Sequence, residues 1–111
     1  MEGNGKFELI VCIVNAGFSQ NLMAAARKAG ARGGSILRGR GSANPESEEF
    51  FNITIQPDKE VILILASEDS KDGILKAIYK DSGLTTDANG IAFTLPVERT
   101  TFTMPKELDE A

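Results

Sequence analysis

Apolar stretches with the pattern of β-strands alternate along this chain with stretches of helical periodicity. The run Phe7–Asn15 is rich in β-branched residues and predicts a strand. From Ser19 onward apolar residues recur every three or four positions until Gly30, which predicts a helix of about three turns with Ser19 as its N-cap. A glycine pair then precedes a second predicted strand, Ser35–Arg40.

A polar segment, Gly41–Glu49, interrupts this alternation and is predicted to be an exposed loop. After it, Phe50–Gln56 alternates between apolar and polar side chains, and a turn at Pro57–Lys59 leads into the apolar run Glu60–Ala66. We therefore predict that these two runs form a β-hairpin.

A second helix is expected next, with Ser67 or Ser70 as its cap and Gly83 as its stop, in the way that Gly30 stops the first helix. Its apolar stripe includes Tyr79, the only tyrosine, which we expect in the core. A polar turn, Leu84–Gly90, leads to a last strand over Ile91–Val97, with its large apolar residues on one face.

Both halves of the chain repeat the order strand, helix, glycine-bearing turn, strand. Two such units predict an α+β fold of the ferredoxin-like βαββαβ type, an antiparallel sheet with two helices on one face. With 111 residues the chain has room for a single domain, 1–111, in which 104–111 are expected to be a loose tail.

Two of the predicted strands are apolar on both faces. These are Phe7–Val14 and Val61–Ala66, which the fold places at the centre of the sheet. Because two helices cover only one face of a sheet, we expect the other face to be buried against further copies of the chain. The alternative is that long apolar strands merely extend past the helix layer.

The composition of the chain excludes several kinds of catalytic and metal-binding site. The chain has no histidine and one cysteine, Cys12, which excludes Ser-His-Asp and Cys-His catalysis, structural zinc and an internal disulfide unless a partner supplies the missing groups. Because Cys12 lies within a continuous apolar strand, we expect it to be buried and unreactive, with a raised thiol pKa.

Net charge and hydropathy bear on where in the cell the protein is expected and on whether it binds nucleic acid or membranes. The net charge of −4 has the wrong sign for a protein that binds nucleic acid mainly through phosphates. The longest apolar runs fall far short of the roughly 20 residues that a membrane-spanning helix needs, and the N-terminus does not resemble a signal peptide. We therefore expect a cytoplasmic protein with no nucleic-acid partner and no direct insertion into membranes.

Two polar segments carry the candidate chemistry. Arg38-Gly39-Arg40-Gly41 combines two guanidinium groups with two residues that allow close approach to the backbone, which suits a phosphate or carboxylate. The turn that contains Asn89-Gly90 can present backbone N–H groups to an anion. A solvated edge strand and an ordinary turn are the simpler interpretations of these segments. The candidate ligand-binding residues are Arg38, Gly39, Arg40, Gly41, Asn89 and Gly90, and no catalytic or metal-binding residue is predicted.

At these segments the chain resembles the PII signal-transduction family, over about Phe7–Thr101. Arg38–Gly41 is similar to the family's Arg-Gly-x-Gly before its T-loop, and Asn89–Val97 is similar to its Gly-Lys-Ile-Phe-x-x-Pro-Val strand. The resemblance implies a non-enzymatic homotrimer with the ferredoxin-like fold that binds adenine nucleotides in clefts between subunits. It also implies docking through the T-loop on a partner, a membrane transporter or a metabolic enzyme.

The chain also departs from the family at several functional positions. The segment that corresponds to the T-loop, Gly41–Glu49, is cut to about nine residues. The family's magnesium-linked glutamine falls near Ser42 or Ala43, so sensing of 2-oxoglutarate is not implied. Its modified tyrosine falls near Phe51. Its B-loop lysine falls at Ile91 and its two C-terminal arginines at Phe102 and Met104, so AMP or ADP is expected to bind at least as well as a triphosphate, and no cofactor is required.

Two other functions stay open at the level of the sequence. A small oligomeric enzyme of the same fold would use Asp87, Glu98 or a threonine in the cleft, and without histidine a carboxylate would have to be the base. A metal-tolerance trimer would bind a hard cation through Glu46, Glu48 and Glu49.

Overall fold

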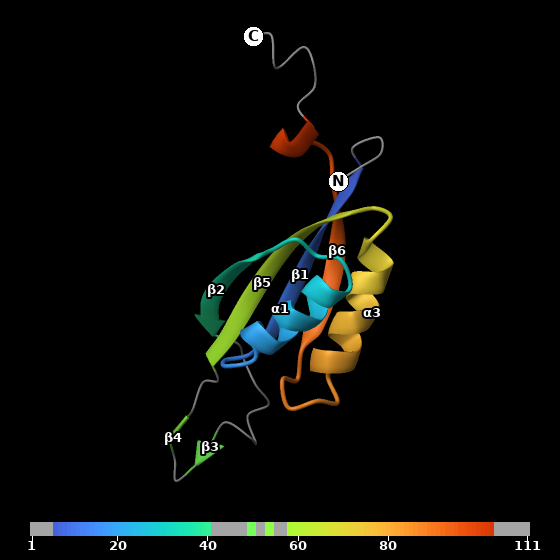
Figure 1. The fold of residues 1–111 in the computed structure, drawn as a ribbon. Coiled ribbons are helices and arrows are strands. Elements are labelled where there is room, and N and C mark those ends of the chain that lie inside the picture. Colours follow the sequence, from blue (N-terminus) through green and yellow to red (C-terminus); the bar gives the residue numbers. More distant parts are fainter. Residues whose placement is uncertain (1–5, 41–48, 51–52, 55–57, 104–111) are drawn as a thin grey trace.

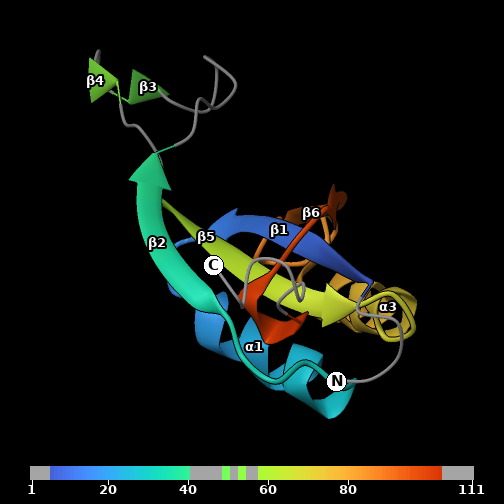
Figure 2. The same cartoon turned by 90° about the horizontal axis from the view of Figure 1, so that it is seen from above.

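The computed structural model describes residues 6–40, 49–50, 53–54 and 58–103. Its main feature is a four-stranded antiparallel sheet in the order β2-β5-β1-β6, with both helices on one side (Figure 1 and Figure 2). This is the α+β, ferredoxin-like βαββαβ architecture that the sequence predicts. The elements are β1 (Phe7–Asn15), α1 (Ser19–Lys28), β2 (Ser35–Arg40), β5 (Asp58–Ser67), α3 (Lys71–Ser82), β6 (Ile91–Val97) and the short 3₁₀ helix η1 (Thr101–Thr103).

The hydrophobic core lies between the sheet and the helices. Alternate residues of the two central strands, β1 and β5, point into it, among them Ile10, Cys12 and Ile64, each fully buried. Burial raises the pKa of the Cys12 thiol to about 12, so the prediction of a buried, raised-pKa cysteine is confirmed. The helices contribute Leu22, Met23 and Ala26 from α1 and Ile74 and Ile78 from α3.

Neither α1 nor α3 covers the opposite face of the sheet (Figure 2). The register places Leu9, Val11 and Ile13 of β1 on that face, next to Leu95, Phe93 and Ile91 of β6. The expectation of two apolar faces on the central strands is confirmed, and the edge strands extend this surface. We call it the bare sheet face; its large apolar residues are Leu9, Val11, Ile13, Leu37, Val61, Leu63, Leu65, Ile91, Phe93 and Leu95.

An aromatic pair covers one end of the bare sheet face. Phe102 of η1 stacks on Phe7, with ring centroids 6.0 Å apart and an interplanar angle of 26°. Phe102 also lines a hollow together with Leu63 and Leu65, which places it over this face. As a result Phe7 is only 3% exposed, whereas Phe102 remains 64% exposed.

The two ends of α1 are stabilised by different groups, a side chain from β5 at the start and a glycine turn at the end. At its start, Phe18 rather than Ser19 occupies the N-cap position and makes no side-chain capping hydrogen bond, so the predicted Ser19 cap is wrong. Instead Oε1 of Glu60, on β5, accepts hydrogen bonds from the backbone N–H groups of Gly17 at 2.9 Å and Ser19 at 3.2 Å. At its end, Gly30 has φ +117°, and the Ala31 N–H donates to the Ala26 carbonyl at 2.9 Å, as the predicted glycine stop requires.

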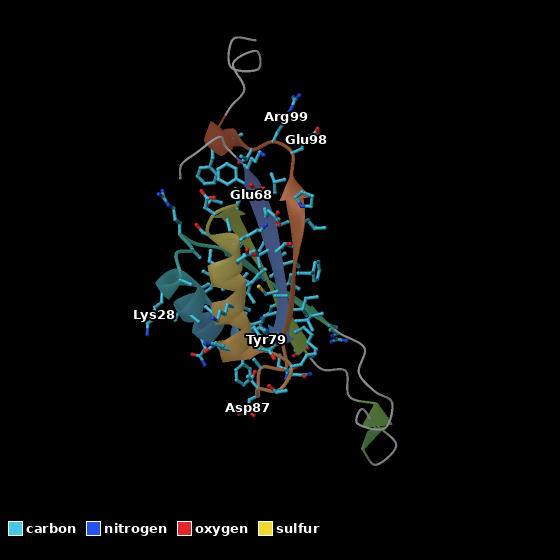
Figure 3. All side chains as sticks on the ribbon, turned by 90° about the vertical axis from the view of Figure 1, so that its right-hand side faces the viewer. Lys28, Glu68, Tyr79, Asp87, Glu98 and Arg99 are labelled. Carbon is cyan, nitrogen blue, oxygen red and sulfur yellow. The ribbon has the colours of Figure 1, made fainter. Side chains whose placement is uncertain are left out.

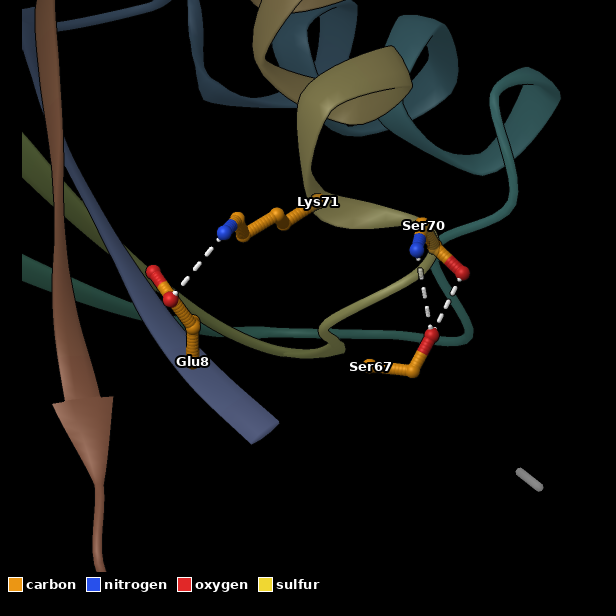
Figure 4. A network of polar contacts seen from close by, with 4 residues as sticks. All are labelled: Glu8, Ser67, Ser70 and Lys71. Atoms are coloured by element: carbon orange, nitrogen blue, oxygen red, sulfur yellow. Dashed lines mark hydrogen bonds and ion pairs between the residues drawn. The ribbon is translucent and has the colours of Figure 1, made fainter. Parts of the chain in front are cut away.

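The start of α3 is held by polar contacts to the sheet (Figure 4). Ser70 occupies the N-cap position without capping, and its backbone N–H donates to Ser67 Oγ at 3.2 Å. Lys71 Nζ lies 3.1 Å from Glu8 Oε2 on β1, and this hydrogen bond raises the pKa of Lys71. The ion pair is three-quarters or more shielded from solvent, so it fixes α3 against the strand.

The predicted hairpin between Phe50–Gln56 and Glu60–Ala66 is wrong. β5 pairs with β1 on one edge and with β2 on the other, and the β2 ladder has six paired positions from Ser35 opposite Leu63 to Arg40 opposite Asp58. Asp58 and Lys59, expected in a turn, are strand residues because they belong to this ladder. The connection between β2 and β5 therefore runs over residues 41–57, longer than the expected loop, and contains a small sheet of β3 (Glu49–Phe50) and β4 (Ile53–Thr54).

Two expectations for α3 also need correction. Tyr79 is 72% exposed rather than part of the core, because Ile74 and Ile78 occupy the face that meets the sheet. Gly83 does not repeat the conformation of Gly30, since its φ is −66°. A Cβ atom at Gly83 would lie 2.5 Å from the Tyr79 carbonyl oxygen, so the position needs glycine for close approach. The predicted loose tail, 104–111, lies outside the described residues.

Candidate functional site

Both candidate segments of the sequence lie at the same end of the sheet, where β2 ends, β5 begins and the turn after α3 leads into β6 (lower end in Figure 1). A hollow of about 360 Å³ opens between them. Gly39 and Arg40 of β2 line it together with Asn89, although these segments are far apart in the sequence. We call this hollow the cationic notch; its lining residues are Ile13, Gly39, Arg40, Lys59, Val61, Leu84, Asn89 and Ile91.

The remaining candidate residues lie around the notch rather than in it. Arg38 lines a neighbouring hollow with Ala16 and Asp58, and the two hollows share Gly39, Arg40 and Lys59. Gly90 lies behind the notch and is buried against Ser82. Gly41 lies outside the described residues. The structure thus brings Gly39, Arg40 and Asn89 together directly, with Arg38 one hollow away.

Asn15 connects the turn before β6 to Lys59 at the edge of the notch through hydrogen bonds. It is not among the residues that the sequence predicts for the site. Its Nδ2 donates to the Asp87 carbonyl at 3.1 Å, and its backbone N–H donates to the Ala88 carbonyl at 2.9 Å. Its Oδ1 accepts a hydrogen bond of 2.7 Å from Lys59 Nζ. An asparagine at the end of an otherwise apolar strand was the available signal, because such a side chain can bond to neighbouring backbone.

The turn before β6 is closed by its own hydrogen bonds. The Asn89 N–H donates to the Thr86 carbonyl at 2.9 Å, and the Gly90 N–H donates to the Ser82 carbonyl at 2.8 Å. A Cβ atom at Gly90 would lie 2.3 Å from that Ser82 oxygen, so glycine is required there for packing. Asn89 has φ +49°, a left-handed conformation that asparagine tolerates. The backbone N–H groups of Asn89 and Gly90 are thus used within the turn, so the expectation that they are presented to an anion is wrong. The turn contributes Leu84 and Asn89 to the lining of the notch.

The two arginines near the notch differ in how freely they could bind an anion. Arg40 faces Asp58 across the ladder, but Nε and Oδ1 are 4.0 Å apart and both side chains are largely exposed, which makes a weak pair. Arg38 faces Glu60, the carboxylate that caps α1. Arg40, with Lys59, is therefore the more available cationic group for an anion in the notch.

Glu60 itself is held in its ionised form. Partial desolvation would raise its pKa, but hydrogen bonds from the backbone N–H of Gly17 and from Ser19, together with the charge of Arg38, outweigh this and lower the pKa below the ordinary value. The carboxylate thus occupies the positive end of α1.

The structure describes some of the candidate residues of the alternative functions. Asp87 and Glu98, candidate bases of an enzyme, lie at opposite ends of the molecule (Figure 3). Within 6–40, 49–50, 53–54 and 58–103, no three Asp, Glu or Cys side chains are close enough to hold a metal ion. Glu46 and Glu48 lie outside these ranges. Neither α1 nor α3, the two α-helices of the described chain, is long and apolar enough to cross a membrane.

No protein-family model matches the sequence, and no curated protein matches it. Solved structures do match the fold. A PII-like signalling protein from Thermus thermophilus superposes with a TM-score of 0.63 at 16% identity, covering 83% of this chain and 86% of that one. Arabidopsis thaliana PII, in a structure with bound citrate, superposes with a TM-score of 0.60 at 23% identity, covering 85% of this chain and 77% of that one.

The sheet order, the two helices and the notch at one sheet end define a ferredoxin-like domain with a candidate anion site. Among domains of this class, the chain has the fold of the PII-like signalling proteins. At such low identity the likeness concerns the fold, and the site residues are argued from this chain's own geometry.

Proposed function

We propose that this protein is a non-enzymatic regulator of the PII-like type, which binds a small organic anion in the cationic notch. The observation that carries the proposal is that Gly39, Arg40 and Asn89 line one hollow, although the sequence separates them by about half the chain. Guanidinium and ammonium groups beside a glycine form a suitable site for a phosphate or carboxylate. The citrate in the Arabidopsis PII structure is a ligand of this chemical kind.

Each candidate residue has a role in this proposal. Arg40 and Lys59 bind the anion, and Arg38 adds positive potential from the neighbouring hollow. Gly39 and Gly41 allow the ligand to approach the backbone. Asn89 offers its amide side chain, and Gly90 fixes the turn that carries it. AMP and ADP are candidate ligands, and no cofactor is needed.

We also propose that the chain forms a homotrimer through the bare sheet face. Phe93 and Leu95 are 44% and 48% exposed there, and the central strands continue the surface. Contiguous apolar patches of this kind mark interaction surfaces, and closed symmetry buries them in equivalent copies. The regulated partner, a transporter or an enzyme, would contact the connection 41–57, which begins directly at the notch.

The ligand proposal is tested by calorimetry and thermal shift with AMP, ADP, ATP, citrate, 2-oxoglutarate and inorganic phosphate. A ligand present at 100 to 1,000 times its Kd should raise stability by about 3 to 4 kcal/mol. Arg40→Ala should weaken binding at least tenfold, because a charge-assisted hydrogen bond contributes about 1.5 to 3 kcal/mol. Arg27→Ala, an exposed arginine at the end of α1, is the matched control and should bind as the original protein does. Equal affinities in the two variants would refute the site.

A further inference from the structure

A second hollow adjoins the cationic notch on the helix side of β6. It has a volume of about 330 Å³, and none of its lining residues is charged. Val14 and Ile78, which are 1% and 3% exposed, lie deepest in its lining. We call it the apolar hollow.

The opening of the apolar hollow is surrounded by unusually exposed apolar side chains. Tyr79, Leu84 and Ile91 line it and are 72%, 62% and 45% exposed. Figure 3 shows Tyr79 at the same end of the molecule as Asp87, where the turn leads into β6. Large apolar groups that gather around one concave surface are typical of a binding site.

Three polar groups of this lining are already hydrogen-bonded within the fold, and the hydroxyl of the exposed Tyr79 is a further polar group there. The Gly90 N–H donates to the Ser82 carbonyl at 2.8 Å, and the Gly83 N–H donates to the Tyr79 carbonyl at 3.1 Å. Ser82 Oγ donates to the neighbouring Asp81 carboxylate. A nucleobase placed here would exchange its hydrogen bonds to water for few new ones, which is unfavourable. A hydrocarbon or aryl group has no hydrogen bonds to water to lose, and its burial in the hollow is favourable.

Leu84 and Ile91 line both the apolar hollow and the cationic notch, so the two are continuous across these residues. Assembly through the bare sheet face would leave the apolar hollow open, because Val14 and Ala92 in its lining face the helices. Ile13, Val61 and Ile91 of the notch belong to the bare sheet face, so in the assembly a neighbouring copy would border the notch. The apolar hollow would stay open to the body of an anion bound there.

We propose that the ligand is an organic phosphate or carboxylate with an uncharged hydrocarbon or aryl body. Its anionic group binds at Arg40 and Lys59, and its body crosses Leu84 into the apolar hollow. This inference rests on the anion site of the proposed function and names the class of ligand that the site accepts.

A series of monomeric phosphates tests the inference by calorimetry: inorganic phosphate, ethyl, butyl and hexyl phosphate, and AMP. Affinity should rise along the alkyl series by up to about fourfold per methylene, since each buried methylene contributes about 0.8 kcal/mol. Hexyl phosphate should bind more tightly than AMP. Vesicles of anionic phospholipid, whose chains are already buried, should not bind, which separates a soluble ligand from a membrane surface.

Variants of Tyr79, which lines the apolar hollow and is not among the lining residues of the cationic notch, locate the effect. Because this side chain is 72% exposed, they should fold normally. Tyr79→Ser should flatten the alkyl series and leave inorganic phosphate unchanged, whereas Tyr79→Phe should preserve the series. Arg40→Ala should weaken every member equally. A flat series in the original protein, or AMP binding more tightly than hexyl phosphate, overturns the inference while the anion site stands. If none of these phosphates binds, the anion site itself is refuted.

Discussion

Lys59 Nζ donates a hydrogen bond of 2.7 Å to Oδ1 of Asn15, which joins the last residue of β1 to the second residue of β5. The same asparagine holds the carbonyls of Asp87 and Ala88. One side chain and its backbone therefore tie the turn before β6 to the strand that supplies a cation to the notch.

Replacing Asn15 with alanine should loosen this turn and weaken anion binding, although Asn15 does not line the notch. We expect a loss of stability of about 1 kcal/mol, the usual contribution of a buried or partly buried hydrogen bond, and faster amide exchange in residues 84–90. Asn21→Ala, at an exposed position of α1, is the control and should change neither property. Unchanged exchange in Asn15→Ala would contradict the assigned role.

Glu60→Gln should destabilise the protein at neutral pH by about 0.5 to 1 kcal/mol, because a charged cap on α1 is replaced by a neutral one. The pKa of Glu60 is lowered in the folded protein, so its contribution is present above the ordinary value of 4.5 and is lost as pH falls through the folded pKa. Urea unfolding of the two proteins should therefore converge in acid. Glu68→Gln, an exposed carboxylate in the turn before α3, should show no such difference.

Leu63→Lys and Ile62→Lys should have different consequences although the residues are neighbours. Leu63 lies on the bare sheet face, so a lysine there should dissociate the assembly and leave folded monomers. Ile62 is fully buried under the helices, so a lysine there should unfold the chain. Sedimentation and circular dichroism separate these outcomes. A monomeric original protein at micromolar concentration would refute the trimer.

If a nucleotide binds in the notch, AMP or ADP should bind at least as well as ATP. Ile91 lines the notch where a third cation would be needed, so a γ-phosphate would be desolvated without a partner. Magnesium-dependent ATP binding, with AMP about a hundredfold weaker, would show that the notch is not the phosphate site.

The sequence predicted the elements that depend on local periodicity, and it failed where distant residues decide. The order of strands and helices, the two-sided apolar strands and both segments of the notch were predictable, because each has its own pattern of residues. The pairing of β2 with β5 could not be predicted in the same way. The alternation of apolar and polar residues within an edge strand does not specify which strand it pairs with, because pairing depends on contacts with distant parts of the chain. The cap of α1 was missed for the same reason, because Glu60 lies 41 positions from Ser19.

The two apolar faces of β1 have a consequence for strand register. A one-residue slip exchanges the faces of a strand, and where both faces are apolar the hydrophobic pattern alone penalises such a slip only weakly. The polar residues near the two ends of β1 supply the missing specificity. A slipped strand would turn Glu8 away from Lys71 and Asn15 away from Lys59. Glu8 would then face the bare side of the sheet and Asn15 the helix side, each without its present partner. These two contacts thus specify the register of β1. Both faces of the strand can therefore be apolar while the central strands still pair in one way.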